Sequence, residues 1–218
     1  MEMASAERAL PLRERKKRRV RSALTETALR LFAEHGFHQT TLERLVDEAE
    51  VSMRTFFRYF SSKEAVAMAA EDELWSAYLA RISDHEFTGT VLDGLRGALV
   101  DALVAMDADW ERRFIAARGL AARTPELREY SALTTIRVQE ELAGEVEARL
   151  GIDGREDVRL RLACEFALSA WRCGAKNWVR GNRHRSEPEG RAALVTHVEE
   201  AFDAIPGTLA LAAPPSGE

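Results

Sequence analysis

The amino-acid sequence predicts an all-α fold, and three observations lead to that prediction. Apolar residues recur at the three- and four-residue spacing of an amphipathic helix through most of the chain. Helix-capping signals separate one apolar stripe from the next. Between Val20 and Pro206 no strand-like alternation and no hairpin dipeptide occurs. A chain of 218 residues with 46% hydrophobic side chains is long enough to bury a core of its own.

The N-terminal part begins with a polar leader, residues 1–13, which we expect to be disordered. The first helix follows it. Its apolar positions run from Val20 to Phe32 as one helical stripe, and Gly36 stands where a C-terminal cap belongs.

Two capping boxes come next. Thr40, followed three residues later by a glutamate, is expected to cap a second helix, and residues 53–59 predict a third after a short break. Ser61, again followed three residues later by a glutamate, is expected to cap a helix that continues to about residue 82.

The remainder of the chain predicts longer helices with recognisable ends. Thr124 and Pro125 form a cap and a first-turn proline, while Gly151 and Gly181 stand where helices end. Residues 207–218 are expected to form a flexible tail. The long helices are expected at about residues 91–108, 110–122, 125–150, 156–180 and 188–204.

The charge is unevenly distributed along the chain. The formal net charge is −5, but residues 1–63 hold 13 basic and 9 acidic side chains, a net of +4, which leaves −9 for the rest. Seven of the nine residues from Arg13 to Arg21 are basic. This asymmetry favours a basic module that meets a polyanion, attached to a module that does not. The alternative is a solvated basic tail.

Other classes of protein find little support. Two cysteines form no disulfide framework, so a reducing cytoplasm is expected, and no apolar run approaches the ~20 residues of a membrane span. Cys164 and Cys173 lie on opposite faces of one predicted helix and cannot pair. His35 and His38 lack the cysteine or carboxylate cluster of a metal site. No catalytic or cofactor-binding motif occurs, so neither an enzyme nor a cofactor is expected.

Residues 40–64 predict two short helices joined by a three-residue turn, which is the arrangement of a helix-turn-helix. Ala49 is small where the two helices must approach closely, and Ser52 is placed to cap the second helix. That helix is expected to bury Phe56 and Phe60, which are four residues apart. The other face of this helix could then lie in a major groove, and it carries Arg54, Thr55, Arg58 and Tyr59.

These residues resemble the N-terminal domain of the TetR family of one-component transcriptional regulators. The preceding helix and Gly36 belong to the resemblance. Glu50 stands where the family has a turn glycine, so local strain or a different turn is expected. Phe57 replaces a tyrosine whose hydroxyl usually reaches a phosphate in this family. The positions in register are Thr41, Leu45, Val46, Ala49, Val51, Ser52, Thr55, Tyr59, Phe60, Lys63 and Glu64.

The resemblance implies that the protein binds a palindromic double-stranded DNA operator, with residues 53–59 in the major groove. Thr41 and Lys63 match TetR-family positions that contact phosphates. Arg44 and Arg58 fall at variable positions of the family, and we include them among the predicted DNA-binding residues because of their charge and orientation. The basic cluster is expected to meet phosphates or a minor groove just ahead of the first helix. The predicted DNA-binding residues are Arg18, Arg19, Thr41, Arg44, Ser52, Met53, Arg54, Thr55, Phe57, Arg58, Tyr59 and Lys63.

The resemblance also implies a helical ligand-binding and dimerisation domain after the helix-turn-helix domain. The predicted domains are a helix-turn-helix domain at residues 14–64 and a larger domain at residues 65–206. Large side chains there could line a pocket for a small, largely apolar effector, or could be ordinary core residues. The segment 171–178 also resembles a region of regulators of the mycofactocin system. The candidate ligand-binding residues are Met106, Trp110, Phe114, Arg118, Trp171, Asn177 and Trp178.

A stripe of small residues lies on the predicted helix 156–180 and permits close approach of another helix. Together with the amphipathic helix that follows, it could form a four-helix dimer interface, or it could pack within one chain. The candidate interface residues are Ala163, Ala167, Ala170, Gly174, Leu194, Val198, Ala201 and Phe202.

The sequence as a whole predicts a homodimeric, ligand-responsive repressor of transcription located in the cytoplasm, with no membrane partner. An activator fits the same residues. One alternative keeps the DNA-binding domain but gives the C-terminal domain only a dimerising or protein-docking role. A second alternative is an all-helical enzyme, for which the sequence offers no nucleophile and base in a recognisable pattern.

Overall fold

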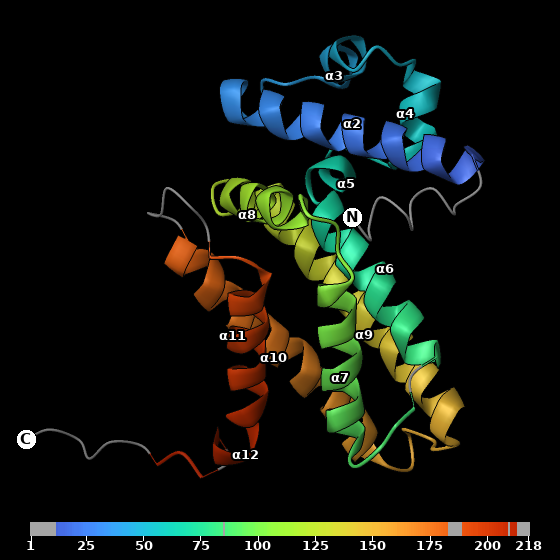
Figure 1. The fold of residues 1–218 in the computed structure, drawn as a ribbon, viewed down its shortest axis with the longest axis vertical. Helices are drawn as coiled ribbons and strands as arrows, with labels where there is room; N and C mark the ends of the chain where they lie inside the picture. Colours follow the sequence, from blue (N-terminus) through green and yellow to red (C-terminus); the bar gives the residue numbers. More distant parts are fainter. Residues whose placement is uncertain (1–11, 85, 183–188, 209, 213–218) are drawn as a thin grey trace, which may run out of the picture. The chain divides into compact units, whose positions relative to one another are not determined.

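The computed structural model of the protein describes residues 12–84, 86–182, 189–208 and 210–212. The predicted all-α fold is confirmed, because the described residues form helices, turns and loops without a strand. Most of the predicted leader and more than half of the predicted tail lie outside the described residues, as does the predicted start of the last long helix. The helices are α2 (Leu12–His35), α3 (Leu42–Glu48), α4 (Met53–Tyr59), α5 (Lys63–Ala67), α6 (Ala69–Asp84), α7 (Val91–Val104), α8 (Trp110–Ala121), α9 (Pro125–Leu150), α10 (Val158–Asn182), α11 (Arg191–Asp203) and α12 (Ile205–Thr208) (Figure 1).

The chain divides into two compact units. The first unit consists of Met1–Asp72 and Arg112–Ser131, and the second consists of Glu73–Glu111 and Ala132–Glu218. The first unit therefore contains α2 to α5 and the first turn of α6, together with most of α8 and the start of α9.

A buried apolar core holds the first unit together. Leu24, Leu31 and Phe32 of α2 pack with Leu45 of α3 and Phe56 of α4. Apolar side chains from α8 and α9 belong to the same core, which explains why those segments join the first unit. They are Ala117, Leu120, Ala121 and Leu127.

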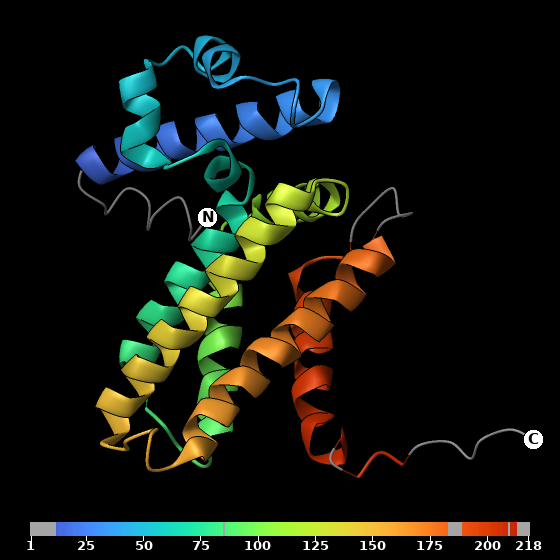
Figure 2. The ribbon, with the colours of Figure 1, turned by 180° about the vertical axis from the view of Figure 1, so that it is seen from behind.

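The second unit is built on long helices, of which α10 and α11 lie side by side (Figures 1 and 2). Trp171 of α10 packs edge-on against Trp75 of α6, with 5.9 Å between the ring centroids. The buried hydroxyl of Tyr78 donates to the backbone oxygen of Leu95 at 3.2 Å, which ties α6 to α7.

Two predicted caps were wrong by one residue. Thr41 caps α3, since its Oγ1 accepts from the backbone nitrogen of Arg44 at 3.2 Å. Thr40 is buried, and its hydroxyl donates instead to the backbone oxygen of Gly36 at 2.9 Å. Ser62 rather than Ser61 caps α5, accepting from the backbone nitrogen of Ala65 at 3.2 Å.

Several predicted helix bounds also differ from the structure. The helix expected from residue 61 to 82 is interrupted at Met68, because α5 ends at Ala67 and α6 begins at Ala69. The helix expected from residue 91 to 108 ends at Val104. The first helix is longer than expected, because α2 already begins at Leu12 and includes the basic cluster. Arginine and lysine are good helix formers, so the cluster can continue the helix toward the N-terminus.

Candidate nucleic-acid interface

The turn between α3 and α4 keeps the geometry of a helix-turn-helix although a glycine is missing. Glu50 adopts a φ of 51°, which lies in the left-handed region that non-glycine residues rarely occupy. Its backbone nitrogen donates to the oxygen of Asp47 at 3.1 Å, and that of Val51 donates to the oxygen of Val46 at 3.0 Å. The strain expected from Glu50 is therefore present, at a cost of about 1–2 kcal/mol.

The second helix, α4, has a buried face and an exposed face, as predicted. Ser52 caps the helix, because its Oγ accepts from the backbone nitrogen of Thr55 at 3.1 Å. Phe56 and Phe60 are buried, with their ring centroids 5.8 Å apart. These contacts fix the rotation of α4 about its own axis, so the opposite side of the helix faces outward. Met53 and Tyr59 are half-buried beside it.

The outward face carries two arginines and an aromatic ring. Arg54, Phe57 and Arg58 are exposed at helical spacings of three and four residues. Together with Thr55 they line an open hollow of about 380 Å³. Neither arginine has a carboxylate partner among the residues that the structure describes. Arg58 instead lies over the ring of Tyr59, 5.1 Å from its centroid.

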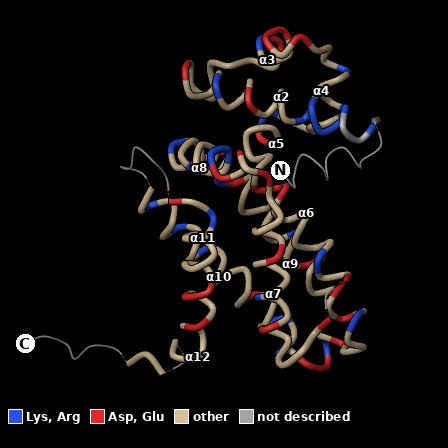
Figure 3. Tube along the Cα trace, viewed as in Figure 1, with Lys and Arg blue, Asp and Glu red and all other residues tan. Residues whose placement is uncertain are grey.

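The start of α2 adds further positive charge to the same unit. Lys16, Lys17, Arg18 and Arg19 are exposed, and Figure 3 shows basic positions on both α2 and α4. Because these residues belong to α2, the prediction of a basic arm ahead of the first helix was wrong. Arg21 was not predicted to have a role of its own. Its Nη1 donates to the backbone oxygen of Tyr59 at 3.1 Å, which joins the basic turns of α2 to the end of α4.

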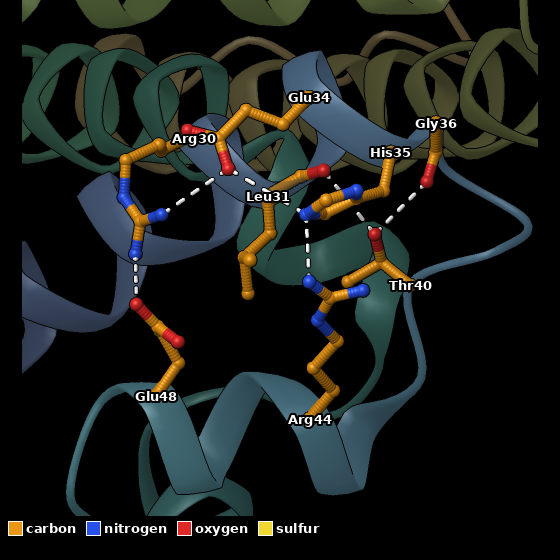
Figure 4. Close-up of polar contacts among 8 residues, drawn as sticks. All are labelled: Arg30, Leu31, Glu34, His35, Gly36, Thr40, Arg44 and Glu48. Atoms are coloured by element: carbon orange, nitrogen blue, oxygen red, sulfur yellow. Dashed lines mark hydrogen bonds and ion pairs between the residues drawn. The ribbon is translucent and has the colours of Figure 1, made fainter.

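Polar contacts also hold α3 against α2 (Figure 4). Arg44 Nη2 donates to His35 Nε2 at 2.7 Å, so this predicted DNA-binding side chain, although exposed, already has a partner. Arg30 reaches both Glu34 at 3.3 Å and Glu48 at 2.6 Å. Exposed pairs of this kind contribute about 0–1 kcal/mol each, so they orient α3 more than they stabilise the fold.

Lys63 points its ammonium group toward the backbone of the loop before α3. Its Nζ donates to the oxygens of Phe37 at 2.9 Å and Thr40 at 3.1 Å, and lies 4.2 Å from the centroid of the Phe37 ring. These contacts give Lys63 a structural role that does not depend on a bound phosphate. A phosphate contact by Lys63 or by the exposed Thr41 stays a prediction.

The candidate ligand-binding residues are distributed over both units. In the second unit Trp110, Trp171 and Trp178 are buried, whereas Asn177 is exposed and Met106 is half-buried. The indole nitrogen of Trp178 donates to the backbone oxygen of Glu189 at 3.0 Å. The tryptophans therefore form part of the packed interior of that unit. In the first unit, Phe114 is buried too.

Arg118 belongs to a polar cluster within the first unit. Its Nη1 lies 3.0 Å from Glu71 Oε2 and donates to Ser131 Oγ at 3.0 Å. The Ser131 hydroxyl donates to the other carboxylate oxygen of Glu71 at 2.8 Å. Since Glu71 is only 5% exposed, Arg118 supplies the positive charge that a buried carboxylate requires.

The small-residue stripe of α10 packs against α11 of the same chain. A Cβ atom added to Gly174 would lie 2.7 Å from the backbone oxygen of His197 and from Val198 Cα. Ala167 and Ala170 are buried, and so are Leu194, Val198 and Phe202 on the facing helix, while Ala163 and Ala201 are half-buried. The stripe was expected to form either a dimer interface or a contact within one chain. The contacts of α10 with α11 support packing within one chain.

A different face of α10 is apolar and exposed. Val158, Leu162 and Phe166 lie four residues apart and are 60%, 45% and 36% exposed. Cys173 is exposed on the same side of the helix. Cys164 is buried, and this burial raises the pKa of its thiol to about 12, so it stays protonated near neutral pH.

The described residues offer neither a cluster of metal ligands nor a helix suited to a membrane. No group of three or more His, Cys, Asp or Glu side chains could hold a metal ion there. None of the described helices has both the length and the apolar character that crossing a membrane requires.

A capped second helix that presents two arginines beside a basic α2 defines a helix-turn-helix DNA-binding protein. Residues 24–70 match the model of the family described as bacterial regulatory proteins, tetR family. The chain is 32% identical to the HTH-type transcriptional regulator TcmR of Streptomyces glaucescens over 173 residues, which is 77% of this chain and 76% of TcmR. The chain belongs to the tetR family, and it is a transcriptional regulator.

Two other similarities are more distant. The mycofactocin biosynthesis transcriptional regulator MftR of Mycobacterium tuberculosis is 29% identical over 134 residues, which cover 59% of this chain and 64% of MftR. The structure of the fatty acid degradation regulator FadR from Bacillus halodurans is similar with a TM-score of 0.51 and 22% identity, covering 87% of this chain and 96% of FadR. The FadR similarity bears on the fold alone.

Proposed function

We propose that the protein is a homodimeric, ligand-responsive repressor that binds a palindromic operator through α4. The observation that carries the proposal is the exposed face of α4, with Arg54 and Arg58 free of carboxylate partners in the described part of the chain. Burial of Phe56 and the cap at Ser52 hold this face in one orientation. A rigid face of this kind suits the reading of base edges in a major groove.

The test of DNA binding is gel retardation of the DNA upstream of the protein's own gene, at several salt concentrations. The association constant is expected to fall with rising salt, by about 0.9 logarithmic units per tenfold change for each phosphate contacted. An unrelated DNA fragment of equal length is the control. Absence of retardation, or an affinity that ignores salt, would contradict the proposal.

The exposed apolar face of α10 supports a homodimer. Each copy would contribute Val158, Leu162 and Phe166, whose burial against a second copy removes apolar surface from water. A two-fold dimer also matches a palindromic operator. The proposed contact would use a different face of α10 from the small-residue stripe, which already packs against α11 within each chain.

Replacing Leu162 and Phe166 together by glutamate is expected to convert the dimer into the 24.4 kDa monomer and to weaken operator binding. Two charges facing the same two charges of the second copy cannot be desolvated without a large cost. Sedimentation at fixed concentration measures the mass. Leu133→Glu is the control, because Leu133 is an exposed leucine of α9 in the same unit. A double variant that stays dimeric would show that the contact lies elsewhere.

An effector has one supporting observation in the second unit. The indole nitrogen of Trp75 is buried and has no hydrogen-bond partner among the described residues. An unpaired buried donor costs about 1–3 kcal/mol, which a small molecule carrying an acceptor would relieve. Trp75 packs against Trp171, so the apolar surroundings match a largely apolar compound.

The second candidate function gives the C-terminal domain only a dimerising or docking role. The close burial of Trp110, Trp171 and Trp178 favours it, because these side chains already fill the interior of the second unit. A screen of small molecules by thermal unfolding separates the two candidates, since a ligand that binds only the folded state raises the melting temperature. Release of the operator by the same compound would identify it as the effector.

A further inference from the structure

Phe57 is the apolar residue on the exposed face of α4. Its side chain is 53% exposed between two arginines, and it lines the same open hollow as they do. Single exposed apolar residues are ordinary on protein surfaces. This one differs because α4 is the helix that the proposed function places against DNA, and because a phenyl ring can neither pair with a phosphate nor hydrogen-bond to a base edge.

The ring of Phe57 is also held in place. It packs edge-on against the ring of Phe56, with 5.4 Å between centroids and an interplanar angle of 85°. Phe56 is fully buried, so the contact fixes one side of the Phe57 ring against the core and leaves its other side outward. A side chain held in this way loses little conformational freedom when it meets a partner.

The chemistry of the major groove offers one apolar partner. Each base edge presents hydrogen-bond donors or acceptors, and the one methyl group among the four unmodified bases is the 5-methyl group of thymine. Arg54 lies three residues before Phe57, and Arg58 lies one residue after it. Both arginines prefer a polar base edge, since a guanidinium pairs with guanine O6 and N7.

We propose that Phe57 recognises the 5-methyl group of a thymine in each operator half-site, within one or two base pairs of a guanine bound by Arg54 or Arg58. The inference rests on the proposed DNA-binding function, and it adds the kind of operator that the protein recognises, namely a half-site with a thymine close to a guanine. The apolar contact removes both the phenyl face and the methyl group from water, which makes thymine favoured over cytosine or uracil at that position.

The test begins with selection of binding sites from random double-stranded DNA, using the full-length protein. Each thymine of the selected half-site is then replaced in turn by deoxyuridine, which removes only the methyl group. At one thymine per half-site, the wild-type protein is expected to lose about fourfold in affinity when one half-site is changed, and about fifteenfold when both are changed. Fluorescence anisotropy at fixed salt measures the affinity.

Variants of Phe57 assign the effect to the ring. Phe57→Ala is expected to bind the operator more weakly and to bind the thymine and deoxyuridine forms equally. Phe57→Leu keeps an apolar side chain and is expected to keep a preference of about twofold or more. Arg54→Ala is expected to lose affinity but to keep the full thymine preference. Thermal unfolding of each variant shows that the fold is retained.

Two results would overturn the inference while leaving the proposed function intact. One is a wild-type protein that is indifferent to deoxyuridine at every thymine of a selected operator. The other is a thymine preference that persists unchanged in Phe57→Ala. If selection recovers no DNA at all, the proposed function fails and this inference fails with it.

Discussion

Replacing Arg54 and Arg58 together by alanine is expected to lower the affinity for the operator by about two to three orders of magnitude. Both side chains are exposed on the face of α4 opposite the buried Phe56, and neither is neutralised by a carboxylate in the described part of the chain. A bidentate contact between an arginine and a guanine is worth about 1–3 kcal/mol, so two such contacts, one in each half-site, account for a loss of this size. Fluorescence anisotropy with the selected operator measures it.

The control removes two equal charges from elsewhere. Arg123 and Arg137 are exposed, and both lie outside the helix-turn-helix. Their double alanine variant is expected to bind the operator within about threefold of the wild type. If the Arg54 and Arg58 variant loses affinity equally on every DNA sequence and its salt dependence flattens, the two side chains contact phosphates rather than bases. If it binds like the wild type, α4 does not lie against the operator.

The local features of the helix-turn-helix could be predicted because short-range contacts determine them. The cap at Ser52 uses the backbone nitrogen of Thr55, three residues away, and Phe56 and Phe60 meet one helical turn apart. The left-handed conformation at Glu50 follows from the turn itself, whichever side chain occupies it. Spacing in the sequence is sufficient for such contacts.

The caps that were wrong required longer-range information. Thr40 and Thr41 are adjacent threonines, and from the local sequence either could cap α3. Thr40 is drawn away from α3 because its hydroxyl reaches the oxygens of Leu31 and Gly36 at the end of α2. Lys63 shows the same limit, since its two backbone partners lie 23 and 26 residues earlier in the chain. No periodic pattern encodes partners at that separation.

For the large side chains of the predicted C-terminal domain, the sequence left open whether each belongs to the core or to a ligand pocket. A buried tryptophan and a pocket-lining tryptophan have the same residue type and the same helical spacing, and the sequence cannot separate them. Arg118 had no sequence signal at all for its structural role, because Glu71 and Ser131 come from two other helices. The stripe of small residues likewise indicates a close helix contact without indicating which chain supplies the second helix.

Gly174→Ala is expected to destabilise the protein by about 1–3 kcal/mol, although alanine is the better helix former. The added methyl group would lie 2.7 Å from the backbone oxygen of His197 and from Val198 Cα. Both are backbone atoms of α11, so they cannot move aside as a flexible side chain would, and α10 and α11 must separate. The cost of this separation exceeds the gain of about 1 kcal/mol in helix propensity.

Gly144→Ala provides the matched control, since Gly144 lies in α9 of the same unit and a Cβ atom there meets nothing within 4 Å. It is expected to stabilise the protein by about 0.5–1 kcal/mol. Urea unfolding at one protein concentration measures both variants, because a dimer's stability depends on concentration. Opposite signs for the same chemical change would show that the contact of α10 with α11 within one chain, and not helix propensity, requires glycine at position 174. Equal signs would mean that the two helices are free to separate at that point.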